Sequence, residues 1–282
     1  MIVCNGVCKR FGDKTVLSGI DMNIPAGSIF GLLGPSGAGK TTLIKILTGQ
    51  LEFDRGSVMT LKKNVKDLTG ENKKQIGIMM DQFGVYDRLS CFDNLKIFAN
   101  LYGIQSSRIY ESLELVGLGD AAKKSAFDLS KGMKVRLQLA RVFMLSPKIL
   151  FLDEPTTGLD PMTQKMIHKI ILSKKKSGCT IFLTTHNMEE AAKLCDTVAL
   201  LNDGVIVDSG SPEGICRKYN HQKRINLVLK SGENMELAHG KESAETIKLL
   251  LMKDEIVTIH SSEPTLESVF LELTGRKLEE EV

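Results

Sequence analysis

The stretch that decides the fold of this chain is Gly34-Pro35-Ser36-Gly37-Ala38-Gly39-Lys40-Thr41-Thr42. An apolar run at residues 29–33 precedes it, and a second apolar-rich run at residues 43–47 follows. This is the order of a strand, a glycine-rich turn and a helix, and the spacing G-x-x-x-x-G-K-[ST] is typical of loops that bind phosphate groups. Glycines let several backbone N–H groups face one anion, and the start of the helix adds positive potential. We therefore expect Lys40 to contact the β- and γ-phosphates of a nucleotide and the Thr41 hydroxyl to bind Mg²⁺.

The composition is that of a globular protein with an apolar core, since 42% of the 282 residues are hydrophobic and 25% are charged. The net charge of +3 gives no reason to expect a nucleic-acid binder held by bulk charge. No apolar run approaches the roughly 18 residues of a membrane span, and residues 1–5 do not have the pattern of a signal peptide. We expect a soluble, cytoplasmic chain whose six cysteines are reduced and bind no zinc.

Short apolar runs separated by amphipathic helices indicate a largely parallel sheet. The clearest runs are residues 76–80, 149–152 and 179–184. Residues 1–28 alternate weakly and contain glycine turns, which predicts short antiparallel strands. Residues 85–147 lack such runs and predict a helical lobe within the same domain.

From residue 219 the pattern changes. A polar stretch at residues 219–224 is followed by a strand, a helix near 241–252, another strand and a last helix from 264 to about 273. We therefore expect a first domain at residues 1–218 and a small α+β extension at residues 219–282.

Candidate catalytic side chains follow two of the predicted buried strands. Asp153 and Glu154 come directly after one of them, and His186 ends the next. Ligands of open parallel sheets bind at the carboxyl ends of the strands, where residues 34–42 also lie. Asp153 is suited to hold Mg²⁺, Glu154 to take a proton from an attacking water, and His186 to contact the γ-phosphate. The other histidines have no such placement and are expected to be structural: His168, His221, His239 and His260.

These motifs and several others occur in one order, which resembles that of an ABC transporter ATP-binding subunit. The resemblance covers roughly residues 1–215 and rests on Gly34 to Thr42, Gln82, Leu129 to Met133, Ile149 to Pro155, Gly158 to Asp160 and Thr185-His186. It implies an α/β P-loop NTPase core with an N-terminal antiparallel β subdomain, a helical signature lobe and a small α+β C-terminal extension. It also implies that Gln82 contacts the metal and assists hydrolysis. Phe11 falls where the family places an aromatic that stacks on adenine; as a residue on its own it is equally well a core side chain.

The segment Leu129-Ser130-Lys131-Gly132-Met133 occupies the place of the family's signature and departs from the usual Leu-Ser-Gly-Gly-Gln. Ser130 still supplies a hydroxyl, Gly132 still allows a close backbone approach, and the helix start still offers positive potential to a phosphate. In the family this segment completes the ATP site of a second copy. The Lys and Met variation, together with residues 264–275, resembles the drug-, bacteriocin- and antibiotic-export subgroup.

The resemblance implies an ATPase that hydrolyses Mg·ATP to drive movement, with export expected, through a separate integral membrane permease. A second ATP-binding subunit, either a homodimer partner or a paralogue, is expected, and so is a peripheral position on the cytoplasmic face of the membrane. By resemblance the helical lobe, near Gln82 to Tyr102, contacts the permease. The alternative is a non-transport ABC ATPase that acts as an assembly or regulatory module. Against it, the short stretch between Thr41 and Ser130 contains no sustained heptads of a coiled coil. A small-molecule kinase fits the motifs less well, because the Asp-Glu pair and the signature argue against it.

Overall fold

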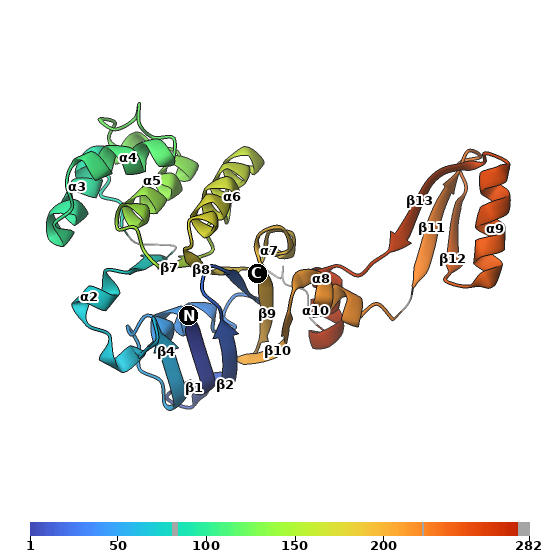
Figure 1. Cartoon of the computed structure of the whole chain (residues 1–282), viewed down its shortest axis with the longest axis horizontal. Helices are drawn as coiled ribbons and strands as arrows, with labels where there is room; N and C mark the ends of the chain where they lie inside the picture. Colours follow the sequence, from blue (N-terminus) through green and yellow to red (C-terminus); the bar gives the residue numbers. More distant parts are fainter. Residues whose placement is uncertain (81–83, 222, 276–282) are drawn as a thin grey trace. The chain divides into compact units, whose positions relative to one another are not determined.

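The computed structural model describes residues 1–80, 84–221 and 223–275, and it divides into two compact units, Met1–Ser209 and Gly210–Val282 (Figure 1). Among these residues no helix has the length and hydrophobicity needed to cross a membrane.

The first unit is built on a six-stranded sheet with the order β10-β9-β3-β8-β7-β6. Its central strands β3 (Ile29–Leu33), β7 (Ile149–Asp153) and β8 (Thr180–Thr185) run parallel, and every one of their residues is buried. This confirms the buried strands predicted from the apolar runs. The remaining strands are β6 (Ile76–Met79), β9 (Thr197–Asn202) and β10 (Val205–Gly210).

Helices connect these strands. They are α1 (Lys40–Leu47), which follows β3, α6 (Pro161–Lys176), which follows β7, and α7 (Met188–Leu194), which follows β8. Asp160 caps α6 and Asn187 caps α7, because the side chain of each accepts hydrogen bonds from N–H groups in the first turn of its helix. The strand–helix alternation therefore brings the starts of α1 and α7 to one edge of the sheet.

A second, antiparallel sheet has the order β2-β1-β4-β5. The strands β1 (Ile2–Phe11) and β2 (Lys14–Ile24) are longer than the short strands expected from the sequence. Register shifts interrupt their pairing, for example between Cys4 and Val7, and such bulges bend long strands that the alternation pattern alone predicts as separate pieces. The sheet is completed by β4 (Arg55–Thr60) and β5 (Lys63–Asn64), and η1 (Val65–Asp67) and α2 (Gly70–Lys73) follow.

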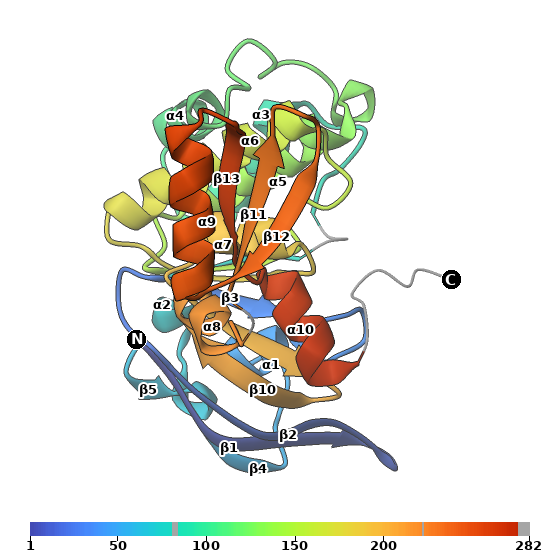
Figure 2. The same cartoon turned by 90° about the vertical axis from the view of Figure 1, so that its right-hand side faces the viewer.

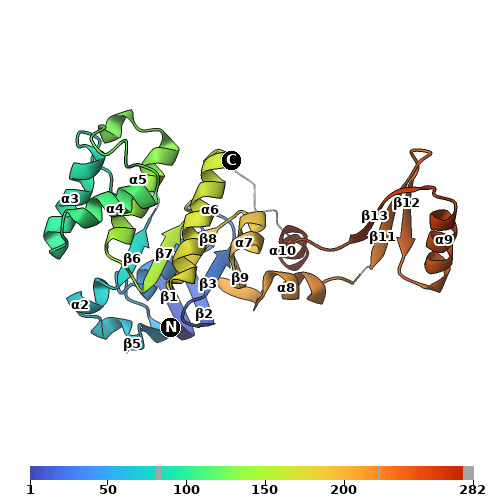
Figure 3. The same ribbon diagram turned by 45° about the horizontal axis from the view of Figure 1, so that its top comes forward.

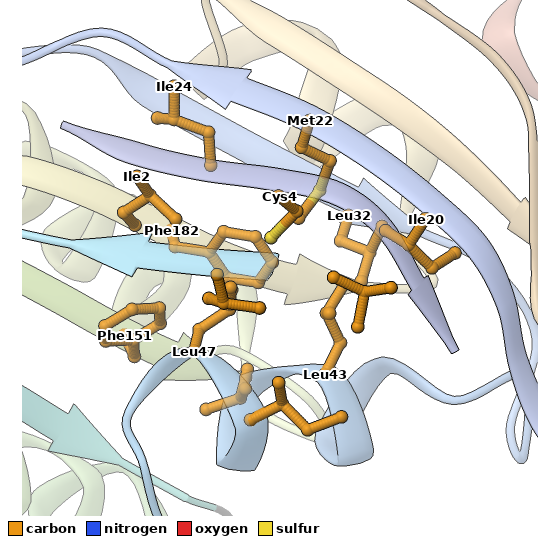
Figure 4. Packing of buried hydrophobic residues seen from close by; sticks show 14 of the residues in the cluster. Ile2, Cys4, Ile20, Met22, Ile24, Leu32, Leu43, Leu47, Phe151 and Phe182 are labelled. Atoms are coloured by element: carbon orange, nitrogen blue, oxygen red, sulfur yellow. The ribbon is translucent and has the colours of Figure 1, made fainter. Parts of the chain in front are cut away.

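The main core lies between the two sheets and α1 (Figure 4). Side chains from the antiparallel sheet meet Leu32, Phe151 and Phe182 of the parallel sheet and Leu43 and Leu47 of α1. The ring of Phe182 lies 5.6 Å from the rings of both Phe30 and Phe151. Because α1 is fixed in this core, the residues that precede it have a rigid support.

The predicted helical lobe consists of α3 (Cys91–Tyr102), α4 (Ser107–Leu115), η2 (Ala126–Asp128) and α5 (Lys131–Met144), which Figure 1 shows in green. Ser90 caps α3 and Ser130 caps α5 by accepting from the backbone N–H three residues on. The lobe is part of the first unit.

The second unit contains a three-stranded antiparallel sheet with the order β12-β11-β13, and α9 (Lys241–Met252) lies along one face of it (Figures 2 and 3). The strands are β11 (Arg224–Leu229), β12 (Asn234–Ala238) and β13 (Ile256–Ser262). The unit also contains α8 (Pro212–Lys218) and α10 (Leu266–Thr274), which pack against each other. It thus includes α8, which precedes the boundary expected at residue 219.

Candidate functional site

The loop between β3 and α1 is shaped by its glycines. Gly39 has φ of 110°, and a Cβ placed on it would lie only 2.9 Å from the carbonyl oxygen of Val16. An L side chain rarely adopts this conformation and would also strike β2, so the position requires glycine. Gly39 precedes α1 and carries no side chain to cap it, which leaves the first-turn N–H groups directed at the space above the loop.

That space is a cavity of about 270 Å³ at the carboxyl edge of the sheet. It is lined by Val16, Ser36, Gly37, Gly39, Lys40, Thr41, Thr42, Asp153 and Glu154. Pockets for whole small molecules usually measure roughly 300–1,000 Å³, so the cavity is the size of a phosphate tail rather than of an entire nucleotide. Of its lining residues, only Val16 was not anticipated from the sequence, because its role depends on how β2 crosses the loop.

Lys40 places a cation in this cavity. Its side chain is 7% exposed, and Nζ donates to the carbonyl oxygens of Gly34, at 2.6 Å, and Pro35, at 3.2 Å. Nζ also lies 3.2 Å from Oε1 of Glu154. The ammonium group is therefore held beside a carboxylate at the place where the loop would receive an anion.

Thr41 and Asp153 form an oxygen pair next to Lys40. The Thr41 hydroxyl donates to Oδ2 of Asp153 at 2.7 Å, and the Thr184 hydroxyl donates to Oδ1 of the same carboxylate at 2.5 Å. Asp153 is buried. Carboxylate and hydroxyl oxygens are the ligands that Mg²⁺ prefers, usually together with phosphate oxygens and waters, so the donor set of Thr41 and Asp153 fits a magnesium ion.

Glu154 has the unusual backbone angle φ of 51°, a strained conformation for a residue with a side chain. Its N–H donates to the carbonyl oxygen of Thr184 at 3.1 Å, which fixes the backbone against β8. Its Oε2 accepts from the Thr157 hydroxyl at 2.8 Å and lies 2.7 Å from Nδ1 of His186. The carboxylate is thereby aimed at the edge of the cavity.

The pKa of Glu154 reflects these contacts. Burial alone raises the pKa, but the hydrogen bond with His186, the charge of Lys40 and the hydrogen bond from Thr157 outweigh burial and lower the pKa to about 2. Glu154 is therefore ionised at neutral pH, as an acceptor of a proton must be.

Other predicted residues lie around this centre without lining the cavity. The carbonyl oxygens of Gly34 and Pro35 accept from Nζ of Lys40, and Ala38, within the loop, is buried. Phe11 is 50% exposed at the end of β1, with Nζ of Lys9 5.1 Å from the centre of its ring. Gln82 lies outside the described residues.

Ser130 and Gly132 lie at the start of α5, and in the described part of the chain they do not line the cavity. Ser130 is exposed, and its Oγ accepts from the N–H of Met133 at 3.3 Å. A Cβ on Gly132 would lie 2.9 Å from Cγ2 of Thr163, so α5 passes close to α6 at this point.

The residues that sequence reasoning missed are mostly threonines at the ends of strands. Thr184 binds both the Asp153 side chain and the Glu154 backbone. The pair Thr184-Thr185 at the end of an apolar run, directly before His186, was an available signal for such polar contacts.

Several known proteins have sequences similar to that of this chain. The ABC transporter family matches residues 17–157. The fluoroquinolones export ATP-binding protein of Mycobacterium tuberculosis is 38% identical over 94% of this chain and 89% of its own length. The methionine import ATP-binding protein MetN of Clostridium acetobutylicum is 34% identical over 91% of this chain and 85% of its own length.

A solved structure of an ATP-binding subunit of an ABC transporter superposes with a TM-score of 0.70 at 23% identity, over 88% of this chain and 99% of that one. This likeness confirms the P-loop α/β fold. Together with the sequence matches it leads to one conclusion: the chain belongs to the ABC transporter family, as an ATP-binding subunit of the kind that hydrolyses ATP to drive transport.

Proposed function

We propose that the cavity above α1 binds the phosphates of Mg·ATP and that Glu154 is the general base for hydrolysis of the γ-phosphate. One observation carries this proposal: the start of α1 and the ends of β7 and β8 bring three pairs of side chains into hydrogen-bonding or ion-pairing distance. The pairs are Lys40 with Glu154, Thr41 with Asp153, and Glu154 with His186. A phosphate cradle, a metal-binding carboxylate and a water-activating carboxylate are the parts that this reaction needs.

The contacts suggest how Lys40 and Glu154 divide their roles. An incoming phosphate competes with Glu154 for Nζ of Lys40, now 3.2 Å from Oε1. Release of Oε1 leaves it able to accept a proton from water, while Nδ1 of His186 still holds Oε2 at 2.7 Å. His186 is further proposed to contact the γ-phosphate.

Thr41 and Asp153, together with Gln82, are the proposed ligands of the magnesium ion. When bound, the ion would neutralise part of the charge on the β- and γ-phosphate oxygens. The contact between Phe11 and adenine stays a prediction. The cavity is the size of a phosphate tail, so adenine would lie outside it, and Phe11 is exposed at the end of β1.

A second copy of the chain, or a paralogue, is proposed to complete the site. Ser130 is exposed at the start of a 14-residue helix, where its hydroxyl and the helix dipole suit a phosphate. Within the same copy, Ser130 does not line the cavity among the described residues. Because it is exposed, the start of α5 is free to bind a phosphate group of the ATP held by a partner.

The proposed contact with an integral membrane permease is a groove of about 350 Å³ between the parallel sheet and the helical lobe. It is lined in part by Ile78 of β6, Phe98 and Tyr102 of α3 and Val142 of α5, with the guanidinium of Arg141 beside them. Leu101, which precedes Tyr102 in α3, is 72% exposed. An apolar groove with a polar rim suits a short segment of another protein, and such a segment would hold the chain at the cytoplasmic face of the membrane.

Export is the proposed direction of transport. It is supported by the likeness to an export ATP-binding protein and by the Lys131 and Met133 variation in the signature segment. Import is the second candidate, since an import ATP-binding protein is 34% identical. Transport by inverted membrane vesicles containing the complex distinguishes the two by the side on which the substrate accumulates.

The proposed ATP site is tested by Lys40→Ala, with Lys45→Ala as a matched control on the exposed face of the same helix. Loss of the Lys40 contact, a charged hydrogen bond, is expected to weaken ATP binding roughly 10- to 100-fold and to abolish turnover. Lys45→Ala is expected to leave both unchanged. Equal ATP affinity in Lys40→Ala and the unaltered chain contradicts the proposal.

A further inference from the structure

Glu190 is a buried carboxylate that the proposed reaction does not use. It lies in the first half of α7, and its side chain is 3% exposed. A buried carboxylate is costly unless it is well hydrogen-bonded, and Glu190 is. Its Oε1 accepts from the Thr156 hydroxyl at 2.6 Å and lies 2.9 Å from Nε2 of His168, while its Oε2 accepts from the Thr185 hydroxyl at 2.9 Å.

These bonds join the two segments that carry the proposed reacting groups. Thr156 follows Glu154 by two residues in the connection from β7 to α6, and Thr185 directly precedes His186 at the end of β8. Glu190 therefore links the same two segments that Glu154 and His186 join directly, with 2.7 Å between Oε2 and Nδ1.

Further contacts hold both the backbone and the carboxylate of Glu190 in place. Its own backbone N–H donates to Oδ1 of Asn187, the residue that caps α7, at 2.9 Å. His168 approaches from α6, so a third segment contacts the same oxygen as Thr156. With three segments meeting at one carboxylate, Glu190 has a fixed position from which to orient the other two.

We propose that Glu190 is a positioning residue for ATP hydrolysis: it holds the segment of Glu154 and the segment of His186 in register, with His168 supporting it from α6. The inference rests on the proposed roles of Glu154 and His186. Its physical basis is that a misplacement of about 1 Å of a reacting group can reduce a rate roughly 100-fold, whereas ATP binding depends mainly on the loop around Lys40, which Glu190 does not touch.

The test compares Glu190→Ala, Glu190→Gln and Glu189→Ala in the full chain. Glu189 is the matched control because it is adjacent, 84% exposed and forms an ion pair along the helix with Lys193. We expect Glu190→Ala to lower kcat at least tenfold while the Kd for a fluorescent ATP analogue stays within about twofold. Glutamine keeps one acceptor and adds a donor for the second threonine, so Glu190→Gln is expected to recover most of kcat. Glu189→Ala is expected to match the unaltered chain.

Two results overturn the inference: an unchanged kcat in Glu190→Ala, or a loss of ATP binding in proportion to the loss of kcat, which is the mark of a merely structural role. If Glu190→Ala fails to fold, Thr156→Val and Thr185→Val take its place, since each removes one of the two links with little change in volume. Loss of either hydrogen bond breaks the link between the two segments. The double variant is therefore expected to have a kcat close to that of the slower single variant. Effects that multiply in the double variant contradict a link through one carboxylate.

Glu154→Gln is measured alongside these variants. If Glu154→Gln retains full turnover, the proposed base is wrong. If Glu190→Ala retains full turnover and Glu154→Gln does not, the base stands and the positioning role alone fails.

Discussion

Replacement of Glu154 by glutamine removes the proposed base while keeping the shape of the side chain. General-base catalysis contributes roughly 10²- to 10⁴-fold to a rate, so we expect Glu154→Gln to lower kcat by that factor, which is about 3–5 kcal/mol in the barrier. A carboxylate whose pKa is about 2 is fully ionised at pH 7, so its removal affects essentially every molecule.

ATP binding is expected to change in the opposite direction. The 3.2 Å between Nζ of Lys40 and Oε1 of Glu154 corresponds to a gross attraction of about 5 kcal/mol at an effective dielectric constant of 20. Much of this is offset by solvation, but an ATP phosphate must still compete with it. In Glu154→Gln that competitor is neutral, so the Kd for ATP is expected to stay equal or to fall.

The assay is phosphate release under saturating ATP, with the Kd of both proteins measured with one non-hydrolysable ATP analogue. Glu189→Gln is the control, because it makes the same chemical change on an exposed side chain nearby. A kcat within threefold of the unaltered chain, or a Kd more than tenfold weaker, refutes the reasoning.

Three further predictions follow from particular contacts. The folded-state pKa of Glu154 is lowered from 4.5 to about 2, so its charge adds stability that is present above about pH 4.5 and is lost as the pH falls towards 2. This contribution is at most roughly 3 kcal/mol, and urea titrations should show this loss on acidification in the unaltered chain and not in Glu154→Gln; parallel curves contradict it. Gly39→Ala is expected to destabilise the chain by about 1–2 kcal/mol and to prevent ATP binding, because of the φ of 110° and the 2.9 Å approach to Val16. Gly70→Ala, which has open space around it, is its control, and equal melting temperatures for the two would argue against a strained loop. Tyr102→Ala in the groove is expected to reduce co-purification with the permease at unchanged ATPase activity of the isolated chain, whereas Tyr110→Ala, exposed on α4 outside the groove, is expected to have no effect; equal losses from both would exclude the groove as the docking site.

Much of the fold could be predicted from the sequence because its signals are local. The all-apolar runs of β3, β7 and β8 need a sheet covered on both faces, and the glycine spacing before Lys40 needs a turn into a helix. The same reasoning placed Asp153, Glu154 and His186 at one edge, because parallel strands end together.

The remaining features depend on contacts between distant segments. Val16 reaches the cavity only because β2 crosses the phosphate loop, and the alternation of residues 1–28 does not contain that information. His168 was expected to be structural, but its partner could not be named from the sequence: it contacts Glu190, which in turn binds Thr156 and Thr185. Glu189 and Glu190 are adjacent in the sequence, but Glu189 is exposed and Glu190 is buried. The sequence of the helix does not indicate which of the two carboxylates is buried.

The proposed mechanism requires that ATP is hydrolysed in a site to which one copy supplies Lys40 and another supplies Ser130. It is tested most directly by mixing purified Lys40→Ala and Ser130→Ala chains, each inactive alone, and measuring phosphate release. Half of the pairs formed at random carry one chain of each kind, and each such pair contains one intact site, so the mixture is expected to regain about a quarter of the unaltered activity. A mixture no more active than its separate components contradicts the shared site.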